Sequence, residues 1–277
     1  HDNLTHDKTT THMNRIIIMG ATSGLGLRVA ERLAEMGWLV GAAGRKDDVL
    51  NDLKARYPDN VVTAHIDVTK SGAPKDLLKL ISKMDGMDVY FHVAGIGYEN
   101  SALNLHDELS TLETNVTGFV RMTATAYRYF RDTGSSGQIA AITSVAGTNG
   151  IGRLASYSST KRFQQTYLRA LNQLATIDGA DVKFTDIRPG WVRTPLLNPH
   201  EEYPMTMRMP YAVPKILKAL LRRKRVAVID WRWNLLVGLW RLIPESLWVK
   251  IPVPVSTSSA SPKDKKINAA EASYDPA

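Results

Sequence analysis

The feature that most constrains the fold is an alternation between short apolar runs and longer amphipathic stretches, which begins near Arg15. The runs at residues 16–19 and 39–43 are apolar on both faces. A strand covered by helices on both sides needs that composition, whereas a sheet with one wet face would show alternation. The rhythm is typical of repeated βαβ units. It predicts an α/β fold, a doubly wound parallel seven-stranded sheet with helices on both faces.

The chain of 277 residues fits one large domain with appendages. We expect a polar tag or flexible lead at residues 1–12, the α/β domain at 13–230, an aromatic and basic amphipathic extension at 231–255 and a disordered polar tail at 256–277. Strands are expected at residues 16–19, 39–43, 61–66, 89–93, 138–143, 182–187 and 226–229, and helices at 25–36, 47–57, 74–83, 106–131, 155–176 and 210–222.

Composition narrows the classes of function. The formal net charge is +8, but no zinc-finger or aromatic RNA-binding pattern accompanies the basic clusters, so we expect no nucleic-acid partner. Cysteine is absent, which excludes disulfides, thiolate catalysis and cysteine-ligated metal sites. The first dozen residues have no apolar core and resemble neither a signal peptide nor a membrane anchor. We expect a soluble, cytoplasmic protein without a catalytic metal.

A glycine-rich turn directly follows the first predicted strand. It comprises Gly20, Ala21, Thr22, Ser23, Gly24, Leu25 and Gly26 and opens into a predicted helix. Glycines let backbone N–H groups and the positive end of a helix approach a pyrophosphate. The G-x-x-x-G-x-G spacing differs from the ordinary dinucleotide fingerprint, and a plain strand-to-helix turn is the alternative. Its place between a strand and a helix favours phosphate binding.

The second predicted strand is followed by Arg45 and Lys46, where dinucleotide-binding proteins that prefer NAD carry an acidic residue. An arginine there can pair with the 2′-phosphate of NADP, because its planar fork suits a phosphate. The alternative is a pair of solvated basic residues leading into the next helix. We expect NADP(H) to be preferred over NAD(H).

A group of candidate catalytic residues lies further along the chain. Ser144 follows the fifth predicted strand, and Tyr157 and Lys161 are four residues apart at the start of a long predicted helix. That spacing places both side chains on one helix face, so the ammonium can favour the phenolate. Free tyrosine has a pKa of about 10 and needs such help to exchange protons at neutral pH. Ser144 would hold the substrate oxygen. The alternative is a ring that packs on a lysine stem.

The order of these features, with Asn115 in a central helix between them, resembles the short-chain dehydrogenase/reductase (SDR) family over residues 15–229. The resemblance implies a Rossmann-like fold. It also implies that Tyr157 exchanges the proton, Lys161 lowers its pKa and binds the nicotinamide ribose, Ser144 orients the substrate and Asn115 completes a proton relay through water. One departure is His92-Val93, where the family usually has asparagines. We expect a supporting rather than a catalytic role for His92.

The resemblance supplies further cofactor contacts. Asp67-Val68 is similar to the adenine contact, Ala94-Gly95 to the wall beside the ribose, and the Pro189-Gly190 segment to the loop that binds the nicotinamide amide. The expected cofactor-binding set is Gly20, Thr22, Ser23, Gly24, Leu25, Gly26, Arg45, Lys46, Asp67, Val68, Ala94, Gly95, Tyr157, Lys161, Pro189, Gly190, Val192 and Thr194.

Two segments bear on the substrate and on partners. A methionine-rich loop at 195–211 either adapts to an apolar substrate or packs on the core. The extension at 231–255 alternates tryptophans with cations, so it either lies on a membrane surface or caps the substrate pocket or a subunit interface. It is too short and interrupted to span a bilayer.

Together these patterns predict an NADP(H)-dependent oxidoreductase that interconverts a carbonyl and a secondary alcohol, with a hydrophobic substrate. The family's habit implies a dimer or tetramer. The alternative is a catalytically idle relative that binds a nucleotide and serves as a sensor or assembly partner.

Overall fold

The central strand β1, Arg15–Met19, shows why the sheet needs two covering layers. Ile16 and Ile18 belong to the apolar cluster on one face, and Ile17 and Met19 to the cluster on the other. Each of the four is at most 1% exposed. The computed structural model describes residues 14–197 and 202–255. The lead expected at 1–12 and the tail expected at 256–277 lie outside the described residues.

The seven expected strands are present and form one parallel sheet in the order β3-β2-β1-β4-β5-β6-β7. The strand order reverses between β1 and β4, and ligands of open α/β sheets bind at such a switch point. Besides β1, the strands are β2 Leu39–Gly44, β3 Val61–His65, β4 Val89–His92, β5 Gly137–Ile142, β6 Val182–Pro189 and β7 Val226–Ile229.

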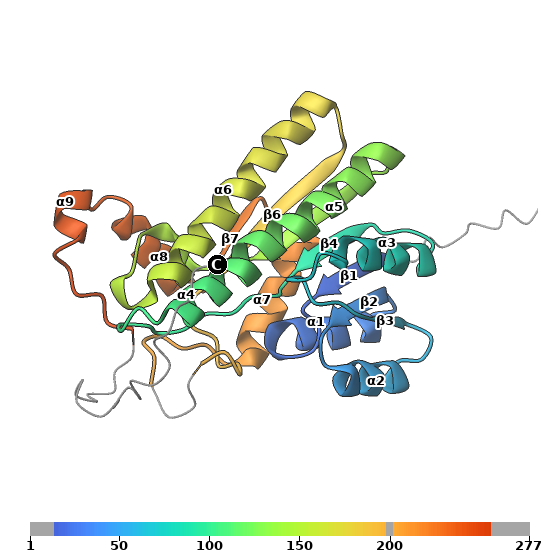
Figure 1. The fold of residues 1–277 in the computed structure, drawn as a ribbon, viewed down its shortest axis with the longest axis horizontal. Helices are drawn as coiled ribbons and strands as arrows, with labels where there is room; N and C mark the ends of the chain where they lie inside the picture. Colours follow the sequence, from blue (N-terminus) through green and yellow to red (C-terminus); the bar gives the residue numbers. More distant parts are fainter. Residues whose placement is uncertain (1–13, 198–201, 256–277) are drawn as a thin grey trace, which may run out of the picture.

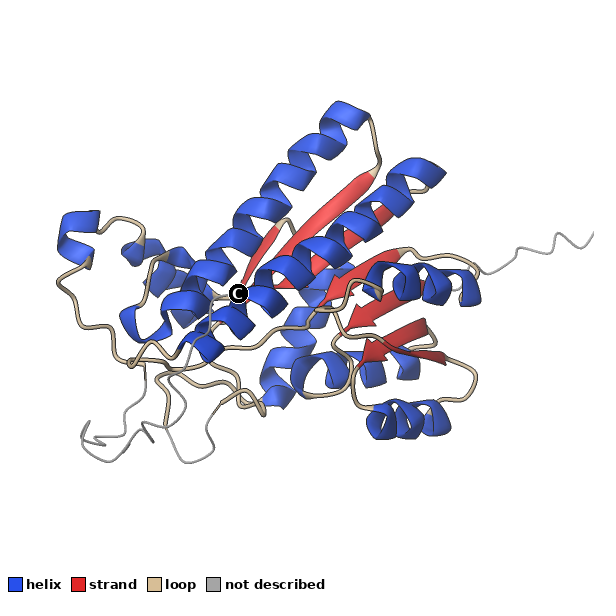
Figure 2. Cartoon of the chain, viewed as in Figure 1, coloured by secondary structure: helices blue, strands red, loops and turns tan. Residues whose placement is uncertain are grey.

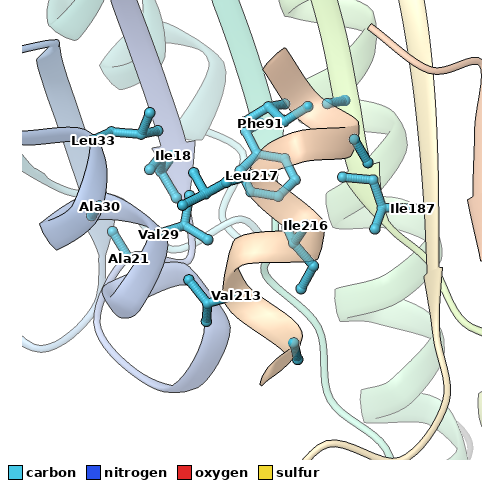
Figure 3. Packing of buried hydrophobic residues seen from close by; sticks show 14 of the residues in the cluster. Ile18, Ala21, Val29, Ala30, Leu33, Phe91, Ile187, Val213, Ile216 and Leu217 are labelled. Carbon is cyan, nitrogen blue, oxygen red and sulfur yellow. The ribbon is translucent and has the colours of Figure 1, made fainter. Parts of the chain in front are cut away.

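Helices cover both faces of the sheet (Figure 1, Figure 2). Figure 3 shows one layer, in which Phe91 of β4 lies among side chains of α1 and α7 such as Val29 and Leu217. The doubly wound α/β fold predicted from the sequence is therefore confirmed. One face carries α1 Gly24–Glu35, α2 Asp47–Arg56 and α7 Met209–Leu221, and the other carries α3 Ala73–Lys83, α5 Phe119–Thr133 and α6 Ala155–Asp178.

The helix expected at residues 106–131 is present, but it is not a regular α-helix throughout. It consists of α4 Leu105–Leu112, a π-helical turn Glu113–Gly118 and α5. Within the turn, the Asn115 side chain accepts a hydrogen bond from the backbone N–H of Ile96 and donates one to its carbonyl. These contacts span 19 residues, and periodicity along a helix carries no sign of them. Such wide turns often occur at functional sites.

The C-terminal extension forms α8 Trp231–Trp240 and α9 Glu245–Trp248. The side chains of Trp233 and Val237 are buried in the core beside β6 and β7, so α8 is anchored to the domain. Within residues 14–197 and 202–255, no helix combines the length and the apolar character that crossing a bilayer requires.

Candidate active site

A cavity of about 560 Å³ opens where the carboxyl ends of the strands meet the loops that follow them. One end is lined by the glycine turn and the loops after β2 and β3, and the other by aromatic residues of the C-terminal segments. Of the predicted site residues, the cavity brings together Gly20, Thr22, Ser23, Gly24, Leu25, Arg45, Asp67, Val68, Ala94, Gly95, Ser144, Tyr157, Lys161, Pro189, Gly190, Val192 and Thr194.

Three predicted residues do not reach the cavity wall. Gly26 is buried behind the turn, where a Cβ would collide with the carbonyl oxygen of Gly20. Its role is the close approach of α1 to β1. Lys46 is exposed and precedes the first residue of α2. Asn115 lies behind the wall, fully buried.

The glycine turn leaves its backbone open towards the cavity. Gly20 has a φ of +99°, and a Cβ on it would come within 2.6 Å of the backbone nitrogen of Ala94. Gly24 has a φ of +51° and begins α1. Both conformations favour glycine, because other residues would be strained there. The positive end of α1 begins at this turn and lies on the cavity wall.

Tyr157 and Ser144 both line the cavity, and their side chains lie within hydrogen-bonding distance of each other. Ser144 caps a short 3₁₀ turn, and its Oγ accepts a hydrogen bond from the backbone N–H of Ala146 at 3.1 Å. Burial raises the pKa of the Tyr157 phenol, and a hydrogen bond with Ser144 lowers it in part. The net pKa lies above the usual value, so the lowered pKa expected from the Lys161 charge is not met in this structure. Burial is the dominant influence.

Lys161 is buried, with 4% of its surface exposed. Its Nζ lies 5.6 Å from the centre of the Tyr157 ring and donates hydrogen bonds to the carbonyl of Ile142 at 3.1 Å and to Oε1 of Gln164 at 3.2 Å. Burial lowers the pKa of Lys161 to about 8, against the attraction of Asp186. The spacing of four residues thus does place both groups on one face of α6, at the cavity.

Asn115 is held by three side-chain contacts. Besides its two bonds to Ile96, its Nδ2 donates to Oγ1 of Thr160 at 3.1 Å. Its main-chain carbonyl accepts a hydrogen bond from Nε2 of Gln164 at 2.9 Å. Asn115 therefore fixes the loop after β4 against α6.

His92 has a supporting place, as its position at a strand end indicates. It is 1% exposed, and its Nδ1 lies 2.8 Å from the Tyr90 hydroxyl. Its ring meets Phe119 edge to face. Burial, together with the Lys161 charge, lowers the pKa of His92 to about 3, so the ring is neutral at physiological pH.

The cofactor end of the cavity carries Arg45 and Asp67. Asp67 accepts hydrogen bonds from the N–H and the hydroxyl of Thr69 at 3.0 and 2.8 Å. Burial acts to raise the pKa of Asp67, but these bonds and the nearby Arg45 charge outweigh it, and the pKa lies below its usual value. Asp67 is therefore a carboxylate at neutral pH.

The other end of the cavity is apolar. Trp233 and Trp240 of α8 and Trp248 of α9 line it, together with Trp191 and Tyr203. The three indoles of the extension follow one another edge to face, with ring centres 6.4 and 5.4 Å apart. Of the alternatives for residues 231–255, a cap on the pocket matches this geometry. Met205 of the methionine-rich loop also lines the cavity, whereas Met207 is buried in the core.

Sequence reasoning missed several polar residues around the site. Gln164 and Gln165 of α6 are buried, and Nε2 of Gln165 donates to the carbonyl of Ser144 at 2.7 Å. Asp186 and Arg188 form a buried ion pair behind Lys161. The one available signal was the presence of two polar residues on the buried side of a helix. No group of three or more potential metal ligands occurs in the described part of the chain.

Comparison with known proteins shows which family this chain is similar to. A description of the family named short chain dehydrogenase matches residues 14–204. An uncharacterized oxidoreductase of Mycobacterium tuberculosis is 30% identical over 246 residues, which cover 84% of this chain and 95% of that protein. The NADP-dependent 3-hydroxy acid dehydrogenase YdfG of Salmonella typhimurium is 31% identical over 181 residues, which cover 64% of this chain and 72% of that protein.

Solved structures share the fold. A short-chain dehydrogenase from Burkholderia cenocepacia in complex with NADP superimposes with a TM-score of 0.74 at 19% identity, over 87% of this chain and 98% of that one. A short-chain dehydrogenase from Sphingobium yanoikuyae in complex with NADPH gives a TM-score of 0.69 at 21% identity, over 84% of this chain and 98% of that one. At these identities the likeness extends to the fold alone.

The buried Lys161 makes stability depend on pH in a defined direction. Between its folded pKa of about 8 and the ordinary value of 10.5, the folded chain binds fewer protons at this site than the unfolded chain. Stability therefore rises with pH there. From pH 7 to pH 9.5, the unfolding free energy of the native protein should rise by about 2 kcal/mol relative to that of Lys161→Met.

Denaturant titrations at the two pH values would measure this difference. The exposed Lys218→Met is the control and should leave the pH dependence of the native protein unchanged. A Lys161→Met curve that parallels the native curve across this range would contradict the assignment of a buried, weakened base.

Proposed function

Because this chain belongs to the short-chain dehydrogenase family, and is therefore an oxidoreductase, we propose that it transfers a hydride between NADP(H) and the carbonyl carbon of an apolar substrate. The observation that carries the proposal is the convergence of Ser144, Tyr157 and Lys161 on the cavity that the glycine turn also lines. The groups come from β5, its following turn and α6, so their meeting is a property of the fold.

The residues present fit a dinucleotide. The turn with Gly20 and Gly24 lines the cavity, and the start of α1 offers backbone N–H groups to a pyrophosphate there. Arg45 lies on the wall after β2, where its guanidinium suits a 2′-phosphate. The name of the Salmonella relative includes NADP dependence, which supports the same choice. When bound, NADP(H) supplies or accepts the hydride.

The residues of the chain handle the proton and the substrate oxygen. In the reducing direction, the Tyr157 phenol donates its proton to the carbonyl oxygen as the new C–H bond forms, and Ser144 donates a hydrogen bond to the same oxygen. The Tyr157 phenol is protonated at neutral pH and can donate its proton, although the burial that raises its pKa also makes it a weaker acid. Lys161 stabilises the phenolate that remains, because its ammonium lies on the same face of α6.

The wall beyond Tyr157 supports an apolar substrate. Aromatic side chains from α8, α9 and the loop at 203–205 form this end of the cavity. Glu99, the acidic side chain on the wall near this end, pairs with Arg153 at 3.1 Å. A bulky, uncharged ketone or secondary alcohol matches such a wall, since a charged substrate would lose its hydration without gaining a partner.

Tyr157→Phe tests the proposal. The variant should bind NADPH with unchanged affinity, measured by its fluorescence, while the rate of NADPH oxidation with a panel of steroid, lipid and aliphatic ketones falls by at least about 10²-fold. Tyr167→Phe on the same helix is the control and should retain full activity. Unchanged turnover in Tyr157→Phe would refute the role of the phenol. Binding of NADPH by the native protein without turnover of any ketone would favour a catalytically idle relative.

Arg45→Asp tests the cofactor preference. The native protein should use NADPH with higher kcat/KM than NADH, and the substitution should reduce or reverse that ratio, because a carboxylate repels the 2′-phosphate. Lys46→Asp makes the same charge change outside the cavity and should alter the ratio far less. Equal kcat/KM for both cofactors in the native protein would contradict the preference.

We further propose a cytoplasmic protein whose α8 lies against an anionic membrane surface. Trp231, Leu235, Leu239 and Leu242 form an outward stripe and are 72%, 60%, 54% and 78% exposed. Arg241 is exposed beside this stripe, and its pKa is lowered first by burial and then by the charges of Arg188, Arg162 and Arg169. Apolar side chains flanked by clustered cations suit a lipid surface of opposite charge.

Sedimentation with anionic vesicles tests the membrane contact. The double variant Leu235→Gln/Leu239→Gln should bind at least about tenfold more weakly than the native protein, because two large apolar groups are lost from the contact. It leaves the inward tryptophans in place. The control Leu78→Gln/Leu221→Gln removes exposed leucines elsewhere and should bind as the native protein does. If neither the native protein nor the control sediments with the vesicles, the proposal of a membrane contact is wrong.

We also propose a homo-oligomer. Leu105, Leu109 and Leu112 on α4 are 58%, 54% and 42% exposed, and Phe163 on the neighbouring α6 is 37% exposed. Association through this face would remove a large apolar area from water.

Light scattering tests the association. The native protein should be a dimer or tetramer, and Leu109→Glu should shift the equilibrium towards the monomer. A monomeric native protein at micromolar concentration would contradict the proposal.

A further inference from the structure

Gln164 is a buried amide directly behind the catalytic pair. It lies on α6 one turn after Lys161 and is 1% exposed. Its Oε1 accepts a hydrogen bond from the Lys161 Nζ at 3.2 Å, and its Nε2 donates one to the main-chain carbonyl of Asn115 at 2.9 Å. One side chain thus connects the ammonium group to the π-helical turn between α4 and α5.

A carboxamide suits this place because it offers an acceptor and a donor on the same planar group. The ammonium needs an acceptor, and the Asn115 carbonyl needs a donor. The side chain of Asn115 cannot make this connection, since its oxygen and nitrogen are committed to Ile96 and Thr160. A carboxylate at position 164 would offer no donor, and a thioether would offer neither group of useful strength.

We propose that Gln164 is a positioning residue, which fixes the Lys161 ammonium between β5 and the Asn115 carbonyl and favours its charged form. The catalytic consequence rests on the proposed function, but the effect on Lys161 does not. The amide is attached to α6 through its own side chain. Its two hydrogen bonds therefore connect the Lys161 Nζ to the π-helical turn at Asn115. A burial of this depth would otherwise favour the neutral amine.

The other groups that face Lys161 do not by themselves account for the stabilisation of its ammonium. From β5 the carbonyl of Ile142 accepts its second hydrogen bond, and from β6 the charge of Asp186 attracts it. Asp186 is itself paired with Arg188, which weakens its pull. His92 on β4 is neutral, and Tyr157 on α6 is protonated at neutral pH. Among the described residues, the Ile142 carbonyl and Gln164 are thus the uncharged acceptors that hydrogen-bond to the Nζ.

The test uses the full chain labelled with ¹³C at the lysine ε-carbons. The Lys161 resonance is assigned by its disappearance in Lys161→Met and followed by NMR as pH is raised. Gln164→Met should lower the Lys161 pKa by about one unit, because an acceptor for the charged form is lost. Gln164→Glu should raise it, because a carboxylate replaces the amide oxygen. The opposite signs separate this role from a merely structural one.

Gln138→Met is the matched control. Gln138 is also a buried glutamine with two hydrogen bonds, to Thr185 and to the carbonyl of Leu220, but it lies at the start of β5. Its loss should leave the Lys161 titration unchanged. If Gln164→Met does not fold, the same downward shift is sought in Gln164→Leu, because a new carboxylate beside the ammonium would raise its pKa whatever the native amide does. A Lys161 pKa that stays constant in the folded position-164 variants would overturn the proposal.

Activity distinguishes this inference from the proposed function. If NADPH is oxidised, the pH limb of kcat/KM that follows Lys161 should move with the NMR titration in both variants. If no ketone is reduced but the titration shifts as expected, the positioning role stands and the proposed reaction fails. If ketones are reduced and the titration does not move, the reaction stands and the role of Gln164 fails.

Discussion

The site depends on a single buried ammonium group. Lys161 sits at the carboxyl ends of β5 and β6, where Ile142, Gln164 and Asp186 each compensate part of the cost of removing its charge from water. That compensation is incomplete, and the pKa of Lys161 falls to about 8. Much of the surrounding polar structure follows from this constraint. The carbonyl of Ile142 and the amide of Gln164 accept hydrogen bonds from the buried charge, and the amide in turn donates one to the Asn115 carbonyl of the π-helical turn.

The C-terminal extension has one face towards the cavity and another towards solvent. Its tryptophans at 233, 240 and 248 close the apolar end of the cavity together with Leu236, while Leu235, Leu239, Leu242 and Leu247 are exposed. Helix α8 is consequently apolar around most of its circumference, unlike an ordinary surface helix with one polar face. The inward face completes the cavity wall. The outward face is the one that we propose to lie against an anionic lipid surface.

Membership in the short-chain dehydrogenase family explains the shared arrangement but not every residue in it. His92 stands at the strand end before Ala94 and Gly95, and its neutral ring packs against Tyr90 and Phe119 behind the catalytic lysine. Gln164 contributes an amide link that helical spacing alone does not indicate. Both residues lie beside Lys161 or its surroundings, and for Gln164 we propose an effect on the proton affinity of Lys161.

The sequence by itself determined the seven strands, the glycine turn and the pairing of Tyr157 with Lys161, because each depends on local periodicity or on spacing within one helix. Only the tertiary structure decided the rest. The contacts of the π-helical turn at Asn115, the link through Gln164 and the burial that sets the pKa of Tyr157 involve segments far apart in the chain. The extension left two alternatives open for the same reason, since composition marks an apolar side chain but does not say whether the sheet, a lipid surface or the cavity lies opposite it.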